Sequence, residues 1–328
     1  MTVSIVITVR DEDPDVLAAT LAGLHATTRH LQPEIVVVDD GSLVPVRCSE
    51  PRVRLLRNPQ PMGVAPARRA GARLAEGDVL VWLDAHMSFG NGWLEQMLVQ
   101  AQSGALLCSP FWSYDLSDCM CWGADFVWCP DRDYAAQRYP GFGLRHRVEW
   151  PKHAVVEVPM VIGACYAMQR RSYDRIGGFN PLFRVWGIDE QDISARAWLG
   201  GCGVACVVNA RVGHLTRQAF PYPVQFEHLE FNQAVMLETV FSRATVERLR
   251  PHYQPLPQTS REWLAAINLE SWRARLQRAR RMTDDNFFAR FIPELRLAQT
   301  TARKSPTRRS ASASRRSTAR SGAAAENR

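Results

Sequence analysis

The triplet Asp84-Ala85-His86 closes an apolar segment of the chain and combines two kinds of side chain that bind divalent metal ions. A carboxylate and an imidazole two residues apart can both face one ion where the backbone turns, and this pair suits Mn²⁺ better than Mg²⁺. A divalent ion that bridges diphosphate oxygens stabilises the charge that develops when a sugar leaves a nucleoside diphosphate. The triplet is therefore typical of a divalent-metal and diphosphate site, although a surface Asp and His after a strand would look the same.

A second segment, Arg211 to Arg217, offers a third ligand and a cation for the diphosphate. His214 follows a glycine and precedes Arg217 by three residues, a pattern typical of an anion-binding turn. The alternative is a loop histidine whose ring bonds to the backbone. We expect His214 to complete the metal site.

Two further pairs of polar residues lie where they could meet a nucleotide. Asp39 and Asp40 end an apolar segment, and a carboxylate there can accept a hydrogen bond from a uracil N–H or a ribose hydroxyl. A turn-forming role is the alternative, above all for Asp40. Arg68 and Arg69 follow Gly63 in a predicted helix, so one of them can meet phosphate while the other faces solvent.

The segment Trp186 to Asp192 holds three acids in four positions, Asp189, Glu190 and Asp192, after an aromatic residue. At least one of them should act on substrate, either by deprotonating an acceptor hydroxyl or by holding the donor sugar. The structural alternative is that acids in the first turn of a helix stabilise its N-terminus.

The elements that must position these residues alternate between strand and helix over the first ~85 residues. The pattern predicts strands over residues 4–9, 34–40, 53–58 and 78–86. It predicts helices after the Asp13-Pro14 cap and over residues 63–77. This order predicts a parallel sheet, whose ligand crevice lies beyond the carboxyl ends of its strands. No Gly-x-Gly-x-x-Gly follows the first strand, which argues against a dinucleotide enzyme.

The second half of the chain is mixed in character. Two strands are predicted, over residues 105–112 and 156–168, and the stretch between them is rich in aromatic residues, glycine and proline. The pattern predicts mostly helix over residues 224–300. Residues 301–328 are rich in Ser, Arg and Ala and have too little apolar content to fold alone.

The net charge of +7 belongs to the C-terminal tail. Residues 301–328 hold eight Lys/Arg and one acid, which leaves 32 basic and 32 acidic residues in the rest of the chain. A nucleic-acid-binding fold should carry its basic surface on the folded part, so a nucleic-acid partner is not expected.

The sequence predicts no membrane span, because no apolar stretch approaches the necessary length. The chain also starts without the pattern of an export signal, and its eight cysteines are more simply read as reduced thiols than as disulfides. We therefore expect a cytoplasmic protein.

Three ordered motifs resemble a known family. The motifs are LDAHM, WGIDEQDIS and VGHLTR. They are similar to motifs of family 2 glycosyltransferases, and within that group to the catalytic domain of polypeptide N-acetylgalactosaminyltransferases. The whole resemblance starts at Thr8 and is spread over ~210 residues. The resemblance implies a GT-A fold, a Rossmann-like nucleotide-binding sheet merged with a smaller, mixed acceptor-side sheet. It also implies a UDP-sugar donor and Mn²⁺ (or Mg²⁺) as cofactor.

The resemblance also implies roles for single residues. It carries the family's metal ligands to Asp84, His86 and His214, and its diphosphate-contacting arginine to Arg217. Its other donor contacts correspond to Thr8 and Arg10 in the first nucleotide-contacting loop, Asp39 as the base-recognising acid, Arg68 on the helix, Gly163 under the sugar and Trp186 in a loop.

One motif departs from the family, because its Glu-Asn is Asp189-Glu190 here. We expect Glu190 to be the base if the reaction inverts configuration, and Asp189 to contact the donor sugar if the reaction retains it. The acceptor, a peptide, glycan or natural product with a hydroxyl or thiol group, stays open. Two alternative functions stay open. The first is that of a sugar nucleotidyltransferase, which normally has a basic, glycine-rich loop after its first strand. The second is that of an inactive binding protein, which its basic tail delivers to nucleic acid or an anionic surface.

The predicted organisation has three parts. Residues 1–223 form the GT-A domain, with a nucleotide-sugar-binding half over 1–104 and an acceptor-side half over 105–223. A helical extension follows over 224–300, and a disordered basic tail over 301–328.

Overall fold

The computed structural model describes residues 1–48, 50, 52–130, 140–217 and 219–296. Residues Met1–Arg296 form one compact unit. The predicted tail, 301–328, lies outside the described residues, and the division near residue 223 stays a prediction. Across the described part of the chain, each helix is too short or too polar to cross a membrane.

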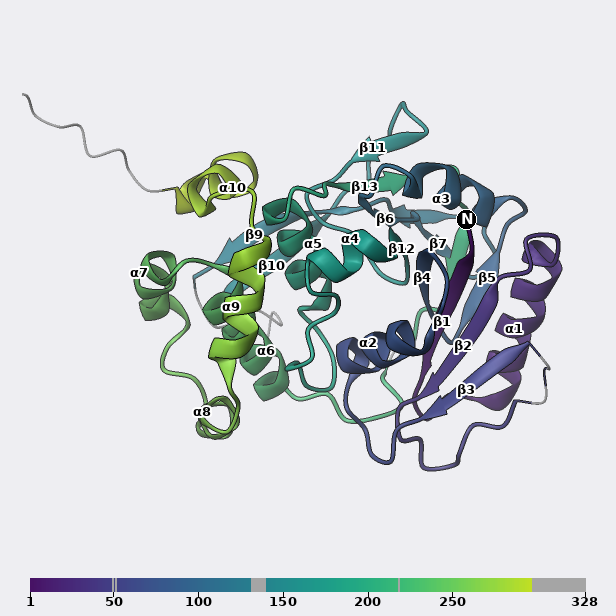
Figure 1. Cartoon of the computed structure of the whole chain (residues 1–328), viewed down its shortest axis with the longest axis horizontal. Coiled ribbons are helices and arrows are strands. Elements are labelled where there is room, and N and C mark those ends of the chain that lie inside the picture. The colour runs from purple at the N-terminus through teal and green to yellow at the C-terminus, as the bar shows by residue number, and fades with distance from the viewer. Residues whose placement is uncertain (49, 51, 131–139, 218, 297–328) are drawn as a thin grey trace, which may run out of the picture. The chain divides into compact units, whose positions relative to one another are not determined.

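An eight-stranded sheet runs through the unit (Figure 1). Its strand order is β11-β13-β6-β12-β4-β1-β2-β3. The strands are β1 (Val3–Val9), β2 (Glu34–Asp39), β3 (Val53–Arg57), β4 (Val79–Asp84), β6 (Leu106–Cys108), β11 (Val155–Glu157), β12 (Cys165–Gln169) and β13 (Val204–Val207). The four N-terminal strands pair in parallel, as the sequence predicts, and β12 joins them antiparallel to β4.

Successive side chains of the parallel strands enter two separate apolar cores, because a strand points its side chains to alternate faces. In β4, Val79, Val81 and Leu83 pack on one face, whereas Leu80 and Trp82 pack on the other. Buried residues of α1 (Pro14–Thr28) and α3 (Trp93–Ala101) cover the first face. The second is covered by α2 (Val64–Leu74), α4 (Arg170–Arg175) and α5 (Asp189–Leu199).

The predicted start of α1 is confirmed. The Asp13 side chain accepts a hydrogen bond from the Asp15 amide at 2.8 Å, and Pro14 occupies the first helical position. The chain therefore leaves β1, turns within a few residues and enters α1, which leaves Arg10 and Glu12 at the carboxyl end of the sheet.

A smaller sheet lies beside the end of β4. It contains β5 (Met87–Phe89), β14 (Val212–His214), β7 (Phe111–Ser113) and β8 (Cys119–Cys121), in that order. β14 runs antiparallel to β5, with His214 opposite Met87. This pairing brings together two motifs that are far apart in the sequence.

The two predicted strands of the second half are each broken. Residues 105–112 form β6 and β7, separated at Ser109-Pro110, and residues 156–168 contain only the end of β11 and most of β12. Proline lacks the amide donor that a strand ladder needs, and both segments contain one. The hairpin β9 (Ala124–Cys129) and β10 (Gly141–His146) forms a separate two-stranded sheet.

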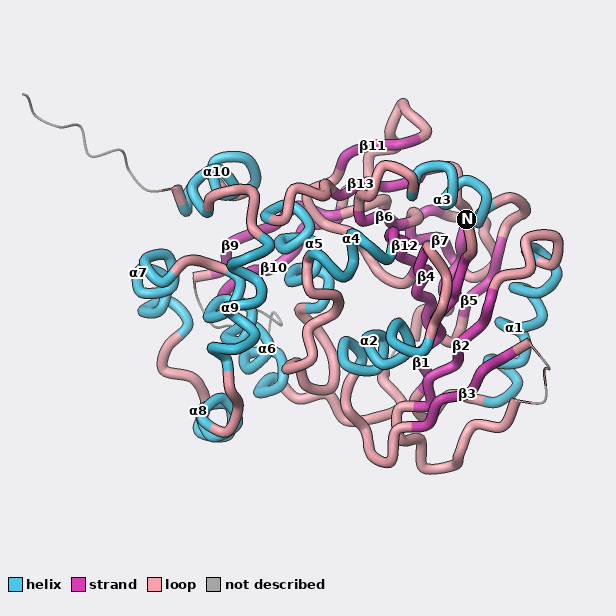
Figure 2. Tube along the Cα trace, viewed as in Figure 1, coloured by secondary structure: helices cyan, strands magenta, loops and turns pink. Residues whose placement is uncertain are grey.

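The helical prediction for the C-terminal part is confirmed (Figure 2). The elements are α6 (Phe226–Val240), α7 (Arg243–Tyr253), α8 (Gln258–Ala265), α9 (Leu269–Ala279), α10 (Asp284–Phe291) and a 3₁₀ turn (Pro293–Leu295). Most residues of α6 are buried, and this helix contacts α5, α7, α8, α9 and β10. The C-terminal helices thus share the core of the sheet on its α5 face.

Candidate active site

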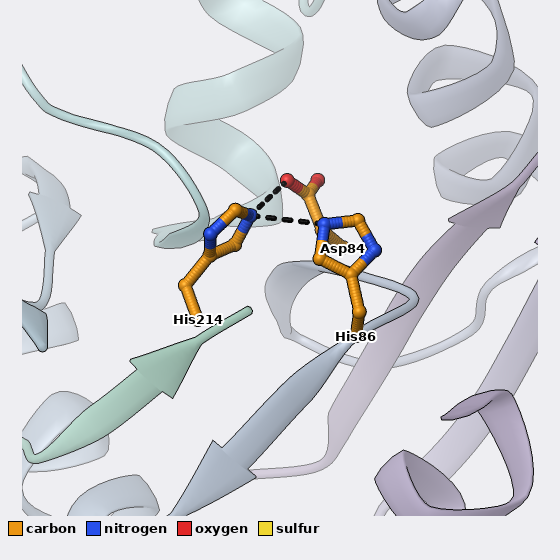
Figure 3. Close-up of side chains that lie close together, drawn as sticks. All are labelled: Asp84, His86 and His214. Atoms are coloured by element: carbon orange, nitrogen blue, oxygen red, sulfur yellow. Dashed lines mark hydrogen bonds and ion pairs between the residues drawn. The ribbon is translucent and has the colours of Figure 1, made fainter. Parts of the chain in front are cut away.

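Asp84, His86 and His214 converge at the carboxyl end of β4 (Figure 3). The Nε2 atoms of His86 and His214 lie 3.0 Å apart, and Nε2 of His214 lies 3.4 Å from a carboxylate oxygen of Asp84. One ligand atom from each residue lies within 4.8 Å of the others. The pairing of β5 with β14 produces this arrangement from residues 128 positions apart.

Glu12 fixes the orientation of the His86 ring. Its carboxylate lies 2.8 Å from Nδ1 of His86, and its other oxygen accepts a hydrogen bond from Arg217. A carboxylate only accepts, so Nδ1 of His86 donates to Glu12, and Nε2 is the ring atom that faces His214. Burial alone would raise the pKa of Glu12, but the hydrogen bonds from His86 and Arg217 outweigh burial and lower it.

Asp84 is held in its charged form. Burial would raise its pKa, yet the contact with His214 and the charge of Arg68 hold the pKa well below the usual range. Arg68 donates to Asp84 at 2.8 Å and to Asp189 at 2.5 Å, and its guanidinium lies over the Tyr166 ring. A buried arginine therefore links the metal-site carboxylate to the start of α5.

These three residues fit a divalent metal ion. Adjacent ligands of an octahedral ion, each about 2.1 Å from it, lie about 3 Å apart, which matches the separation of the two Nε2 atoms. The carboxylate that orients His86 is the usual partner of a metal-bound imidazole. Nδ1 of His214 has no hydrogen-bond partner among the described residues.

A cavity of about 1140 Å³ opens beside this cluster. Its wall contains ten of the twelve predicted site residues: Thr8, Arg10, Arg68, Asp84, His86, Gly163, Trp186, Glu190, His214 and Arg217. The strands of the hairpin β9–β10 form part of the same wall, through residues such as Trp128 and Leu144. The volume is large enough to hold a drug-sized ligand.

The structure does not place Asp39 in the cavity wall. Its carboxylate accepts hydrogen bonds from the Ser42 and Val46 amides and from Arg57, and it is fully buried. Asp40 does reach the wall, but its oxygens are engaged by the Met62 and Gly63 amides and by Asn58. Both carboxylates therefore stabilise the loops that follow β2 and β3, which is the alternative that the sequence left open for them. A nucleobase contact by Asp39 stays a prediction.

The two acids that open α5 differ in exposure. Asp189 is 3% exposed and paired with Arg68, whereas Glu190 lines the cavity and accepts a hydrogen bond from the Tyr166 hydroxyl at 2.7 Å. Burial and the neighbouring Asp189 charge raise the pKa of Glu190 to about 8, against the opposing effects of Arg68 and Tyr166. Of the pair, Glu190 is the acid that a ligand can reach.

Gly163 lies close beneath Glu190. A Cβ atom at this position would lie 2.8 Å from the Tyr166 hydroxyl and 3.0 Å from a Glu190 oxygen. The absence of a side chain therefore keeps the floor of the cavity open next to the Glu190 carboxylate.

Sequence reasoning missed three residues of this site. Glu12 stands in an acidic run, and nothing in the run distinguishes it from its neighbours. Tyr166 belongs to an apolar strand, and Tyr222 follows the VGHLTR motif; Tyr222 lines the cavity, with Arg10 stacked 4.3 Å from its ring centroid.

The sequence profile of Glycosyl transferase family 2 matches residues 4–176, just over half of the chain, and that of the N-terminal domain of galactosyltransferase matches residues 146–218. Human polypeptide N-acetylgalactosaminyltransferase 14 is 27% identical over 239 residues, which cover 67% of this chain and 41% of that protein. The Drosophila melanogaster polypeptide N-acetylgalactosaminyltransferase 3 is 28% identical over 242 residues, which cover 67% of this chain and 35% of that protein. The chain thus spans less than half the length of these curated relatives.

The fold is also similar to that of GalNAc-T7, whose crystal structure contains UDP, GalNAc and Mn²⁺. The TM-score is 0.70 at 20% sequence identity, with 88% of this chain and 56% of GalNAc-T7 covered. The predicted GT-A fold is confirmed by this similarity.

Proposed function

Because this chain belongs to Glycosyl transferase family 2, we propose that it transfers a hexose or N-acetylhexosamine from a UDP-sugar to a hydroxyl or thiol acceptor. Mn²⁺, or Mg²⁺, is the cofactor of this proposal, with Asp84, His86 and His214 as its ligands.

The observation that carries the proposal is the position of the ligand cluster. Three metal-binding side chains meet on the wall of a large cavity, and the same wall contains Arg217, which Glu12 holds next to His86. Such a wall presents both a metal site and a fixed guanidinium to one anionic group, as a nucleoside diphosphate requires.

The metal ion, when bound, supplies positive charge to the diphosphate as the sugar leaves. Arg217 adds a second cation, and its pairing with Glu12 limits the directions in which its guanidinium can point. Arg68 acts differently, because it is buried between Asp84 and Asp189 and compensates their charges. Its contacts support a role in holding the two carboxylates in place.

Glu190 is the group we assign to the acceptor. Transfer forms a bond between the anomeric carbon and the acceptor oxygen or sulfur, breaks the bond to the diphosphate, and releases the acceptor proton. Glu190 lines the cavity and can receive that proton when its carboxylate is ionised. Because its pKa is about 8, the ionised fraction of Glu190 increases as the pH rises above neutral. This assignment applies to inversion; in a retaining reaction we assign the donor-sugar contact to Asp189.

The relatives suggest which substrates to test first. Their names describe transfer of N-acetylgalactosamine to a polypeptide, so we propose UDP-N-acetylgalactosamine and Ser/Thr peptides as the first donor and acceptor. A cytoplasmic location is likewise a proposal, which rests on reading the eight cysteines of the sequence as reduced thiols.

Calorimetry with UDP and Mn²⁺ tests the proposed function. The wild type should bind UDP more tightly in the presence of Mn²⁺, and Asp84→Ala should lose this dependence. His30→Ala is a matched control, because His30 also contacts a glutamate, Glu95, but on the surface away from the cavity. Equal Mn²⁺ dependence in wild type and Asp84→Ala would refute the metal assignment, and absence of UDP binding by the wild type would refute the donor.

A further inference from the structure

The loop that precedes α5 carries backbone strain at the edge of the cavity. We call residues 184–188 the Trp186 loop. Val185, Gly187 and Ile188 have positive φ angles of 51°, 94° and 70°. Val185 and Ile188 are β-branched, and β-branched residues rarely adopt this conformation because their side chains clash with the backbone in it. Something outside the loop must therefore hold it.

Asn232, a fully buried residue of α6, bonds to the loop at both ends. Its Oδ1 accepts from the Arg184 amide at 2.8 Å, and its Nδ2 donates to the carbonyls of Arg184 and Gly187 at 2.9 and 3.0 Å. The Trp186 carbonyl lies 3.3 Å from the same nitrogen. One side chain thus lies within hydrogen-bond distance of four polar groups of the loop backbone.

Other residues of α6 complete the support. Gly187 packs so tightly on Leu229 that a Cβ atom there would lie 2.2 Å from the leucine side chain. The Arg184 guanidinium lies over the ring of Phe231, 5.4 Å from its centroid. A contact from another element adds to this support, because the Val64 amide at the start of α2 donates to the Val185 carbonyl at 2.9 Å.

The loop determines where three residues of the site lie. Trp186 lines the cavity directly. Ile188 is the N-cap residue of α5, so its backbone angle sets the direction in which Asp189 and Glu190 leave the loop. A change of the loop would move Glu190 relative to the cavity and Asp189 relative to Arg68.

We propose that Asn232 is a positioning residue, which keeps the Trp186 loop in its strained conformation and thereby places Trp186 and Glu190 in the cavity wall. Its effect on transfer rests on the proposed function, whereas its effect on the loop does not. Asn232 acts through the backbone, because its side-chain bonds go to groups of the loop and not to the cavity.

Two variants of α6 separate a local from a general effect. Asn232→Leu removes all of these bonds while conserving approximate volume. Gln233→Leu is the matched control, because Gln233 is the next residue of the same helix, is 1% exposed, and has no side-chain hydrogen-bond partner among the described residues. The control should therefore keep its stability and its loop.

Amide hydrogen exchange on the ligand-free proteins tests the first half of the proposal. In Asn232→Leu, the amides of Arg184 and Val64 should exchange about 100-fold faster than in the wild type, while core amides of β1 and β4 change far less. Uniform acceleration of all amides, or unchanged exchange at Arg184, would overturn the proposal.

Steady-state hydrolysis of UDP-N-acetylgalactosamine tests the second half, at a temperature where each variant is folded. Asn232→Leu should lose about 100-fold in kcat/KM, since a small misplacement of the site has costs of this order. Asn232→Asp keeps the acceptor for Arg184 but not the donors, so it should be impaired as well, whereas Gln233→Leu should match the wild type. Faster local exchange with unchanged kcat/KM would refute positioning. A wild type that hydrolyses no UDP-sugar would refute the proposed function instead, and exchange would still decide whether Asn232 holds the loop.

Discussion

Replacing Glu12 by Gln should weaken Mn²⁺ binding without touching a predicted metal ligand. The Glu12 side chain is 4% exposed and bridges two groups, with one oxygen 2.8 Å from Nδ1 of His86 and the other bonded to Arg217. Glutamine can accept from only one of them. Its NH₂ group must then face an N–H donor, which leaves either His86 or Arg217 without a partner.

The magnitude follows from these contacts. Loss of the carboxylate that orients a metal-bound histidine typically costs 10- to 100-fold in metal affinity. We therefore expect the Kd of Mn²⁺, measured with saturating UDP at pH 7, to rise by about 10- to 100-fold in Glu12→Gln. Because a neutral amide also removes the charge that holds Arg217, the affinity for UDP should fall in the same variant.

The assay is calorimetric titration of Mn²⁺ into protein with UDP, with Glu95→Gln as control. Glu95 contacts His30 at 2.6 Å in an exposed pair, so its substitution removes a similar contact away from the site. Wild-type Mn²⁺ affinity in Glu12→Gln, in a protein of unchanged secondary structure, would refute the reasoning about His86. Equal weakening in Glu95→Gln would show that the effect is general.

Two further predictions concern Arg217 and Glu190. Arg217→Ala should weaken UDP binding about 10- to 100-fold, as loss of a charge-assisted hydrogen bond implies; unchanged UDP affinity by calorimetry would remove Arg217 from the diphosphate site. The pKa of Glu190 is about 8 in the folded state, against an ordinary value of 4.5, so folding favours its protonated form. As the pH rises from 4.5 to 8, the wild type should therefore lose stability relative to Glu190→Gln, by at most about 1.4 kcal/mol per pH unit. Urea unfolding of both proteins at pH 5, 6.5 and 8 measures this difference, and a difference that stays constant with pH would contradict the raised pKa.

The N-terminal half of the fold follows from local patterns. The apolar strands, the Asp13-Pro14 helix start and the polar residues after β4 are each encoded within about ten residues, so the sequence predicts them. The sequence does not predict the breaks at Pro110 and Pro159, although each segment contains a proline, because the apolar residues around it favour a strand.

The site was only partly predictable, because several of its contacts depend on pairing between distant segments. His214 reaches His86 only because β14 pairs with β5, and Asn232 reaches the Trp186 loop only through packing of α6. The surroundings of Asp39 were not predictable either: Arg57, opposite Asp39 in β3, bonds to its carboxylate. No sequence pattern specifies such a partner in advance.

The central claim is that Asp84, His86 and His214 form the binding site of a divalent ion used with a nucleotide sugar. Anomalous diffraction near the manganese absorption edge, from crystals grown with Mn²⁺ and UDP, tests it most directly. We predict a peak within ligand distance of all three residues, with the diphosphate beside it and near Arg217. A Mn²⁺ peak elsewhere in the cavity, or UDP bound with no anomalous peak at these residues, would contradict the assignment.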